Sequence, residues 1–280
     1  MATVKLAAHR GYSAKFPENT MLAMREAVKL DIDMLEIDVH MTKDGEIILM
    51  HDHTVDRTSN GTGLIREKTF AEMRALDVGA WKDEEFAGER VPTFREFLEF
   101  FKDYPTLEVN VELKDYPAHS GDFAYESCDK SLALIEEYGI TDRVYINCWS
   151  GTLLEYISKK HGERYRLHGY YPAFLNGQPK NEGKALDFGE DFFKKTFCVC
   201  LFNRVPDENG NAAKLDDPVM PLEAFDYVRS LGVEPWVYYS DDCRRDLMLA
   251  IERGAVGVTS NDPVISGAIL NETGARTFKK

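Results

Sequence analysis

Eight short apolar runs, separated by longer amphipathic stretches, recur along the whole chain. They lie at 6–8, 34–39, 107–113, 144–148, 166–170, 197–201, 235–239 and 256–259. Runs of this length and composition are typical of strands buried in a parallel sheet, and the stretches between them have the length and periodicity of helices. Eight such strand and helix units predict a closed (β/α)8 TIM barrel. A doubly wound open sheet is the alternative, although no GxGxxG turn supports it.

One further apolar run, at 46–51, follows its predecessor too closely for a parallel connection. Only a short turn separates it from the strand at 34–39. A turn of this length fits an antiparallel β-hairpin, because a parallel crossover needs about a dozen residues or more. The hairpin would lie beyond the C-terminal end of the second barrel strand. It would bring His51 back towards the level of Glu36 and Asp38.

A polar, loop-rich segment follows this hairpin at about 52–106. Long loops in compact domains are usually functional, so we interpret the segment as a small insertion over the C-terminal face of the barrel that shapes substrate entry. Within it, Thr93 and Glu96 form a capping box for a helix that ends near Tyr104. We therefore expect one domain over 1–280 that includes the insertion.

The amino-acid composition and net charge disfavour some classes of binding partner. The 280 residues are 44% hydrophobic, which suits the core of one large α/β domain. The net charge of −14 disfavours nucleic acid or an anionic membrane surface as the main partner, since both need clustered Lys and Arg. No hydrophobic signal segment or run of about 20 apolar residues is present, so we expect a cytoplasmic protein without stable membrane insertion. The odd number of cysteines and the lack of a CxxC pair predict buried free thiols. The cysteines are Cys128, Cys148, Cys198, Cys200 and Cys243.

Carboxylates occupy one face of two strands that should be apolar on both faces. Side chains two apart on a strand point the same way, so Glu36 and Asp38 share a face, as do Glu112 and Lys114 on the later strand. A buried carboxylate must be protonated, paired or bound to a cation. Three carboxylates without cysteine ligands favour Ca²⁺ or Mg²⁺. The alternative is a metal-free salt-bridge network with Arg10 and Lys114.

Two histidines and two cations complete the candidate site. His9 and Arg10 end the first strand, at the rim where barrel enzymes keep their active sites. Together with His51, His9 offers two imidazoles for acid and base roles. Arg10 and Lys114 supply positive charge suited to phosphate oxygens. Carboxylates, imidazoles and cations in this combination indicate phosphoryl-ester cleavage.

These residues resemble, in order, the signature motifs of the glycerophosphodiester phosphodiesterase family, over nearly the whole chain. The motifs are His9-Arg10-Gly11, Pro17-Glu18-Asn19-Thr20, Glu36-Ile37-Asp38-Val39, Thr42-Lys43-Asp44-Gly45, His51-Asp52, Arg57-Thr58, Asn110-Val111-Glu112-Leu113-Lys114 and the late Trp236. The segment 258–263 resembles the closing motif of the family, with Ser260 where the family has an aspartate.

The resemblance implies a metal-dependent barrel enzyme that hydrolyses glycerophosphodiesters to an alcohol and sn-glycerol 3-phosphate. Our hypothesis for the mechanism is that the reaction passes through a cyclic phosphate. The resemblance also implies an acid and base pair of histidines, a carboxylate metal site, a phosphate clamp and an aromatic contact to the substrate. His9 and His51 would be the acid and base pair, and Glu36, Asp38 and Glu112 would hold the metal. Arg10 and Lys114 would bind the phosphate, and Trp236 would contact the substrate. A packing role for Trp236 is the alternative.

Other histidines and other functions compete with this interpretation. His119, His161 and His168 are expected to be structural or exposed, whereas His40 either faces solvent at the hairpin or supports the metal ligands. A lipid phosphodiesterase of the sphingomyelinase D type would release a cyclic phosphate. A catalytically silent binding module on the same barrel is a second alternative, and a sugar-phosphate isomerase or aldolase a third. The head-group preference, the choice between Ca²⁺ and Mg²⁺, the histidine that acts as the base and the oligomeric state stay open at this stage.

Overall fold

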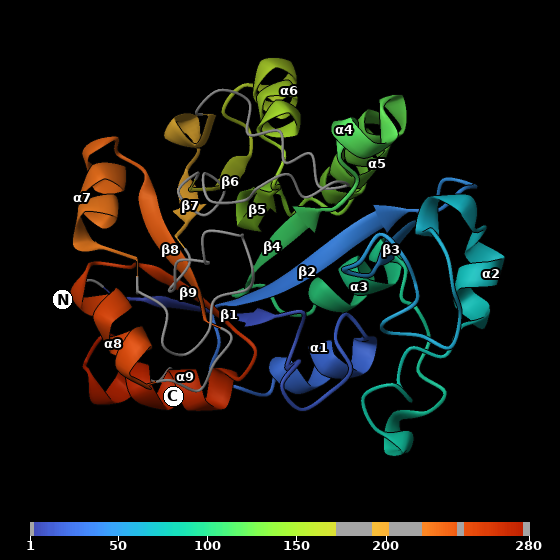
Figure 1. Cartoon of the computed structure of the whole chain (residues 1–280), viewed down its shortest axis with the longest axis horizontal. Helices are drawn as coiled ribbons and strands as arrows, with labels where there is room; N and C mark the ends of the chain where they lie inside the picture. The colour runs from blue at the N-terminus through green and yellow to red at the C-terminus, as the bar shows by residue number, and fades with distance from the viewer. Residues whose placement is uncertain (1–2, 172–191, 202–219, 240–243, 277–280) are drawn as a thin grey trace.

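Eight parallel strands close into a barrel in the computed structural model, which describes residues 3–171, 192–201, 220–239 and 244–276 (Figure 1). Each strand pairs with the next, and the last returns to the first. The strands are β1 (Lys5–His9), β2 (Met34–Met41), β4 (Glu108–Leu113), β5 (Val144–Asn147), β6 (Arg166–Tyr170), β7 (Cys198–Cys200), β8 (Glu234–Tyr239) and β9 (Gly257–Ser260). The predicted barrel is confirmed, because all eight expected strands are present close to their expected ends.

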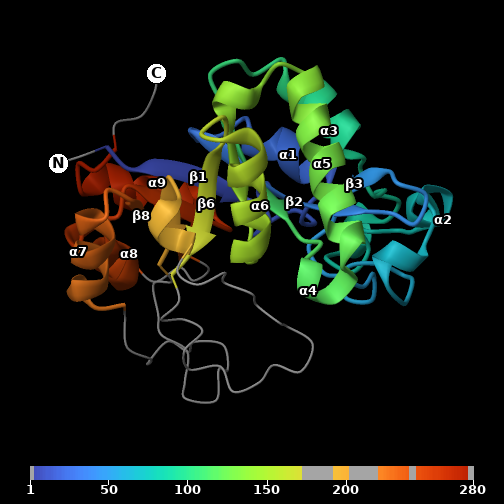
Figure 2. The ribbon, with the colours of Figure 1, turned by 90° about the horizontal axis from the view of Figure 1, so that it is seen from above.

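Helices cover the outer face of the barrel. Figure 2 shows α7, α8 and α9 on one side of it and α3 and α5 on the other. The helices are α1 (Met21–Ala27), α2 (Phe70–Ala75), α3 (Phe94–Phe101), α4 (Pro117–Ser120), α5 (Asp122–Glu137), α6 (Gly151–His161), α7 (Leu222–Ser230), α8 (Arg244–Glu252) and α9 (Pro263–Glu272). No helix in the described ranges is long and apolar enough to cross a membrane.

The predicted hairpin is also confirmed. The extra strand β3 (Ile47–Leu49) pairs antiparallel with the end of β2, with Val39 opposite Leu49. The backbone N–H of Met50 then donates to the carbonyl of Asp38 at 3.1 Å. The chain therefore returns His51 to the level of the carboxylates.

The segment after β3 has a small core of its own. Val55, Ile65, Met73 and Val78 pack with Ile48 of β3, apart from the main core. Figures 1 and 2 both show α2 at the outer edge of the molecule, beside β3. A separate core on the hairpin explains how this segment is held beside the barrel.

The segment predicted as inserted, 52–106, also contains α3, which belongs to the ring of helices packed on the barrel. The capping box expected at its start is present, because Thr93 and Glu96 each accept a backbone N–H from the other. Its buried face, which includes Phe94, Phe97 and Phe101, belongs to the main core. The part of the segment outside the barrel therefore ends before α3.

Inward-facing side chains stack in layers along the barrel axis. At the N-terminal end of the strands, Glu108 forms ion pairs with Lys5 at 2.5 Å and with Arg166 at 2.7 Å. An apolar layer lies above them and contains Ala7, Met34, Tyr145, Cys198 and Trp236. The acidic and imidazole side chains come next, at the C-terminal ends of the strands. The candidate site therefore lies above a closely packed layer, at the end of the strands where barrel enzymes keep their active sites.

Gly257 lets the Trp236 ring fit within the barrel. A Cβ atom at this position would overlap the Trp236 ring. We expect Gly257→Ala to destabilise the fold by roughly 1–3 kcal/mol, because a fully buried ring cannot move aside in a close-packed interior. Denaturant unfolding measures the change. Gly267→Ala is the matched control, since Leu6 lies at an ordinary 3.5 Å from the added atom. A Gly257→Ala variant as stable as Gly267→Ala would contradict this packing argument.

The described cysteines are buried free thiols, as predicted. They are Cys128, Cys148, Cys198 and Cys200, whereas Cys243 lies outside the described residues. Burial raises the pKa of the Cys128 thiol to about 12, so this side chain stays protonated and unreactive. These four residues act as small apolar side chains in the core.

Candidate active site

Three carboxylates meet at the C-terminal ends of β2 and β4. Glu36 and Asp38 share the inner face of β2, and Asp38 lies opposite Glu112 in the parallel register. All three are buried, and one oxygen from each lies within 4.8 Å of one oxygen of the other two. The sequence prediction that these residues come together is confirmed by this geometry.

Two cations neutralise only part of this cluster. The Lys114 ammonium lies 2.7 Å from Glu112 and 3.7 Å from Asp38. The Arg10 guanidinium lies 3.1 Å from Asp38, but it is also paired with Glu18 at 2.7 Å. The negative charge of the three carboxylates therefore exceeds the positive charge of their partners, and a further cation would balance it.

The protonation of the carboxylates reflects this imbalance. Burial and the negative charges of Asp38 and Glu112 raise the pKa of Glu36 well above its ordinary value. Burial opposes ionisation of Asp38 as well, but the neighbouring positive charges lower its pKa below the ordinary value. Asp38 Oδ1 is buried and has no hydrogen-bond partner among the described residues. An unsatisfied buried carboxylate oxygen beside two further carboxylates fits a hard divalent cation such as Ca²⁺ or Mg²⁺.

His9 extends from the end of β1 towards the carboxylates. Its Nδ1 lies 2.5 Å from the amide oxygen of Asn261, and an amide oxygen only accepts, so Nδ1 carries the proton. Nε2 is then unprotonated and lies 3.9 Å from Glu36. Burial and the charge of Arg10 lower the pKa of His9 to about 3. The ring is therefore neutral, with a lone pair in the site.

His51 is oriented in the same way by a carboxylate. Its Nδ1 lies 2.6 Å from Asp52, which in turn accepts from Arg57 at 2.7 Å. Nε2 is the nitrogen left for chemistry, and the Asp52 charge favours the protonated form of this ring. Burial and the charge of Lys114 oppose that form and lower the pKa of His51. Both imidazoles thus present Nε2, each through a fixed partner on Nδ1.

The loop after β1 holds Arg10 in an unusual backbone conformation. Arg10 has a φ of +56°, and its backbone N–H donates to Glu36 at 2.8 Å. Gly11 follows with a φ of +80°, where a Cβ would overlap the backbone of Ala23. A strained residue at a candidate site persists only where its surroundings hold it. Here the strain directs both the side chain and the N–H of Arg10 to the carboxylates.

Trp236 does not lie where a substrate contact was predicted. Its side chain is 1% exposed and packs in the apolar layer, with its ring centroid 5.1 Å from that of Tyr145. Tyr238, two residues further along the same face of β8, lines the cavity instead. Its ring lies 4.6 Å from the His9 ring between centroids. We therefore assign Trp236 to packing and replace it by Tyr238 as the aromatic side chain at the site.

Several residues of the site were not given a role from the sequence. Asn19 donates to Asp38 at 2.8 Å, and the Tyr170 hydroxyl donates to Glu112 at 3.1 Å. His168, expected to be structural, lines the cavity and pairs with Asn110 at 3.1 Å. Asn19 belongs to the motif Pro17-Glu18-Asn19-Thr20, which was the sequence signal for a role at the site. The local sequence around Tyr170 and His168 contains no motif that predicts a place for them in the site.

Two cavities lined by described residues share His9, Arg10 and Tyr238. The inner one, of about 100 Å³, is also lined by Glu36, His51 and Glu112. The outer one, of about 340 Å³, is lined by residues of the loop after β1 and by three side chains of the segment after β3. These three are Arg57, Trp81 and Lys82. A ligand that spans both cavities would pass between the two histidines and the insertion.

Sequence comparisons match this chain to phosphodiesterases. Residues 9–177 match the family described as "Glycerophosphoryl diester phosphodiesterase family". A glycerophosphodiester phosphodiesterase of Caldanaerobacter subterraneus subsp. tengcongensis is 41% identical over 211 residues, which are 66% of this chain and 84% of that protein. Human glycerophosphodiester phosphodiesterase 1 is 45% identical over 91 residues, 32% of this chain and 28% of that protein.

Solved structures share the fold. A glycerophosphodiester phosphodiesterase from Agrobacterium tumefaciens superimposes with a TM-score of 0.70 at 24% identity, over 95% of this chain and 100% of that one. An Oleispira antarctica phosphodiesterase, solved in complex with the product sn-glycerol-3-phosphate, gives a TM-score of 0.76 at 21% identity, over 96% and 97% of the two chains. At these identities the likeness is one of fold.

Proposed function

The chain belongs to the glycerophosphoryl diester phosphodiesterase family, and we propose that it hydrolyses glycerophosphodiesters to an alcohol and sn-glycerol 3-phosphate with a divalent cation. The family resemblance predicted from the motifs is confirmed, and the protein is a phosphoric diester hydrolase. The observation that carries the metal-dependent mechanism is the juxtaposition of three buried carboxylates with two imidazoles. We propose Glu36, Asp38 and Glu112 as the residues that hold the cation.

The cation would be Ca²⁺ or Mg²⁺, because the donor set consists of oxygen alone. When bound, it supplies positive charge to the phosphoryl oxygens and polarises them for attack. Arg10 and Lys114 flank the same carboxylates and support phosphate binding from either side. The planar guanidinium can bind two phosphate oxygens, whereas the ammonium acts as a compact charge.

The two histidines carry the protons in this proposal. One imidazole removes a proton from the 2-hydroxyl of the glycerol unit, whose oxygen then attacks phosphorus. The other imidazole donates a proton to the departing alkoxide. Water opens the resulting cyclic phosphate with the two roles reversed. The fixed protons on Nδ1 of His9 and His51 support this proposal, because each ring then offers Nε2 to the substrate.

The two cavities suggest how the diester binds. The inner cavity suits the glycerol and phosphate groups, because Glu36, Glu112 and both histidines line it. The outer cavity would take the departing head group, so that Arg57, Trp81 and Lys82 of the insertion contact it. We therefore propose one domain over 1–280 whose insertion shapes substrate entry. The product named for the Oleispira antarctica structure, sn-glycerol-3-phosphate, is the product proposed here as well. The cytoplasmic location expected from the sequence stays a prediction.

Product analysis on glycerophosphocholine tests this function. We expect choline and sn-glycerol 3-phosphate in equal amounts, loss of turnover after chelation, and recovery when Ca²⁺ or Mg²⁺ is added back alone. Phosphorus NMR distinguishes these products from a cyclic phosphate that accumulates, which would favour the sphingomyelinase D alternative. Choline phosphate as a product, or full turnover by protein shown to be free of metal, would contradict the proposal. No turnover with either metal would revive the binding-module alternative.

A further inference from the structure

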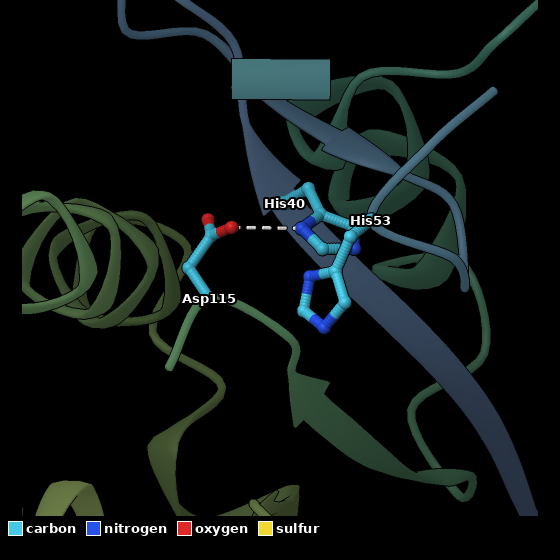
Figure 3. Close-up of side chains that lie close together, drawn as sticks. All are labelled: His40, His53 and Asp115. Carbon is cyan, nitrogen blue, oxygen red and sulfur yellow. Dashed lines mark hydrogen bonds and ion pairs between the residues drawn. The ribbon is translucent and has the colours of Figure 1, made fainter. Parts of the chain in front are cut away.

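We propose that His40, His53 and Asp115 form a second cation site, suited to a divalent transition metal such as Zn²⁺ and separate from the three-carboxylate cluster. The three side chains come from the end of β2, the segment after β3 and the segment after β4. Figure 3 shows them pointing towards one another. One ligand atom of each lies within 4.8 Å of one ligand atom of the other two.

Asp115 is held ready as a ligand. One of its oxygens, Oδ2, accepts from the backbone N–H of Met41 at 2.8 Å and from the Ser127 hydroxyl at 2.7 Å. The other oxygen, Oδ1, faces the His40 ring. The Asp115 side chain is 7% exposed, and a buried carboxylate in this position requires a positive partner. The two bonds on Oδ2 fix the direction in which Oδ1 can bind a cation.

The His40 ring lies between two oxygens that both need a donor. Nδ1 lies 2.8 Å from Asp115 Oδ1, and Nε2 lies 3.3 Å from the backbone oxygen of His51. A neutral imidazole has only one N–H, so it can satisfy only one of them. When Nε2 donates to the His51 carbonyl, the Nδ1 lone pair and the carboxylate oxygen point at the same space. A metal ion bound there would satisfy both.

His53 supplies the third ligand. Its ring lies across that of His40, with centroids 5.2 Å apart and planes at 70°. Neither ring nitrogen of His53 has a hydrogen bond to another described residue. A neutral His53 ring therefore has a lone pair that no described residue uses and that can bind a metal ion. The His119 ring lies 5.3 Å beyond, between centroids, and a water molecule or His119 would complete the coordination.

The donor set separates this site from the three-carboxylate cluster. Two imidazoles and one carboxylate suit Zn²⁺ and similar ions, whereas an all-oxygen set suits Ca²⁺ or Mg²⁺. Zinc ligands lie about 2.0–2.2 Å from the ion, so the ligand atoms of a tetrahedral site lie about 3.4 Å apart. Asp115 Oδ1 and His40 Nδ1, which are 2.8 Å apart, must therefore separate slightly, while the His53 nitrogen must lie well within the 4.8 Å limit. His53 is only partly buried and can make this adjustment. Binding would tie the segment that carries His51 to β2 and β4.

Zinc titration in the presence of saturating Mg²⁺ tests the inference, because Mg²⁺ occupies the carboxylates and leaves the histidines. We expect one equivalent of Zn²⁺ to bind the wild-type protein by calorimetry, and His53→Ala to weaken it at least tenfold. Co²⁺ used as a probe should give visible absorption bands that are absent in His53→Ala. His161→Ala, which removes a histidine on α6, is the matched control and should bind as the wild type does.

Failure of this inference is distinguishable from failure of the proposed function. Glu112→Gln should lose turnover and keep the Zn²⁺ equivalent and the Co²⁺ bands. Wild-type protein that binds no Zn²⁺ under saturating Mg²⁺ would overturn the inference. So would His53→Ala with unchanged affinity and spectrum. Asp115→Asn is a second variant, but it also disturbs the hydrogen bonds to Met41 and Ser127, so His53→Ala, at a partly exposed position, carries the test.

Discussion

His51→Ala lowers kcat on glycerophosphocholine by about 10²- to 10⁴-fold, which is the usual contribution of a residue that transfers a proton. His9→Ala has an effect of the same order. Each ring presents Nε2 to the cavity through a fixed partner on Nδ1, so the loss of either removes one proton transfer from both steps. Steady-state kinetics with saturating metal measure the change. KM should change much less than kcat, because we propose that Arg10 and Lys114, rather than the histidines, bind the phosphate.

The matched control for the histidine variants is His161→Ala. His161 lies on α6, and its ring packs against Tyr165 rather than in the cavity. We expect its kcat within a few-fold of the wild type. Activity of His51→Ala or His9→Ala at that same level, in a protein with an unchanged circular dichroism spectrum, would remove that histidine from the mechanism.

The second large effect is expected for the metal ligands. Glu112→Gln keeps the size of the side chain but removes its charge, so the cluster loses an ionic ligand and Lys114 loses its partner at 2.7 Å. We expect the affinity for Ca²⁺ or Mg²⁺ to fall at least tenfold, and kcat/KM to fall by roughly 10²-fold or more at a fixed metal concentration. Calorimetric metal titration and kinetics measure both effects.

Glu108→Gln is the matched control for Glu112→Gln. It changes the same residue type on the same strand, β4, but at the opposite end of the barrel, where Glu108 pairs with Lys5 and Arg166. We expect lower stability without loss of metal affinity. Equal loss of metal binding in both variants would indicate a general effect on the fold. Unchanged metal affinity in Glu112→Gln would contradict its role as a ligand.

The architecture could be predicted because periodicity is a local property of the chain. The apolar runs and the capping box at Thr93 determine strands and helices through their own residues. The site carboxylates could be predicted for the same reason, since side chains two apart on β2 must share a face. Strand ends then placed His9 and Glu112 at one rim of the barrel.

The depth of a side chain within the barrel could not be predicted. Trp236 and Tyr238 share a face of β8, and only the register between strands decides which of them reaches the cavity. Trp236 pairs with Gly257, whose missing side chain leaves room for the large ring in the apolar layer. The partners of the histidines were also beyond sequence reasoning, because Asn261 meets His9 from the far end of the chain.

We propose above all that Glu36, Asp38 and Glu112 share one hard cation, and a crystal structure of the protein grown with Ca²⁺ is the decisive test. We expect an anomalous difference peak with one oxygen of each carboxylate at about 2.3–2.6 Å. The cavity that contains His9 and His51 should adjoin this peak. A well-ordered site with no peak, in which Lys114 and Arg10 alone bind the three carboxylates, would contradict it.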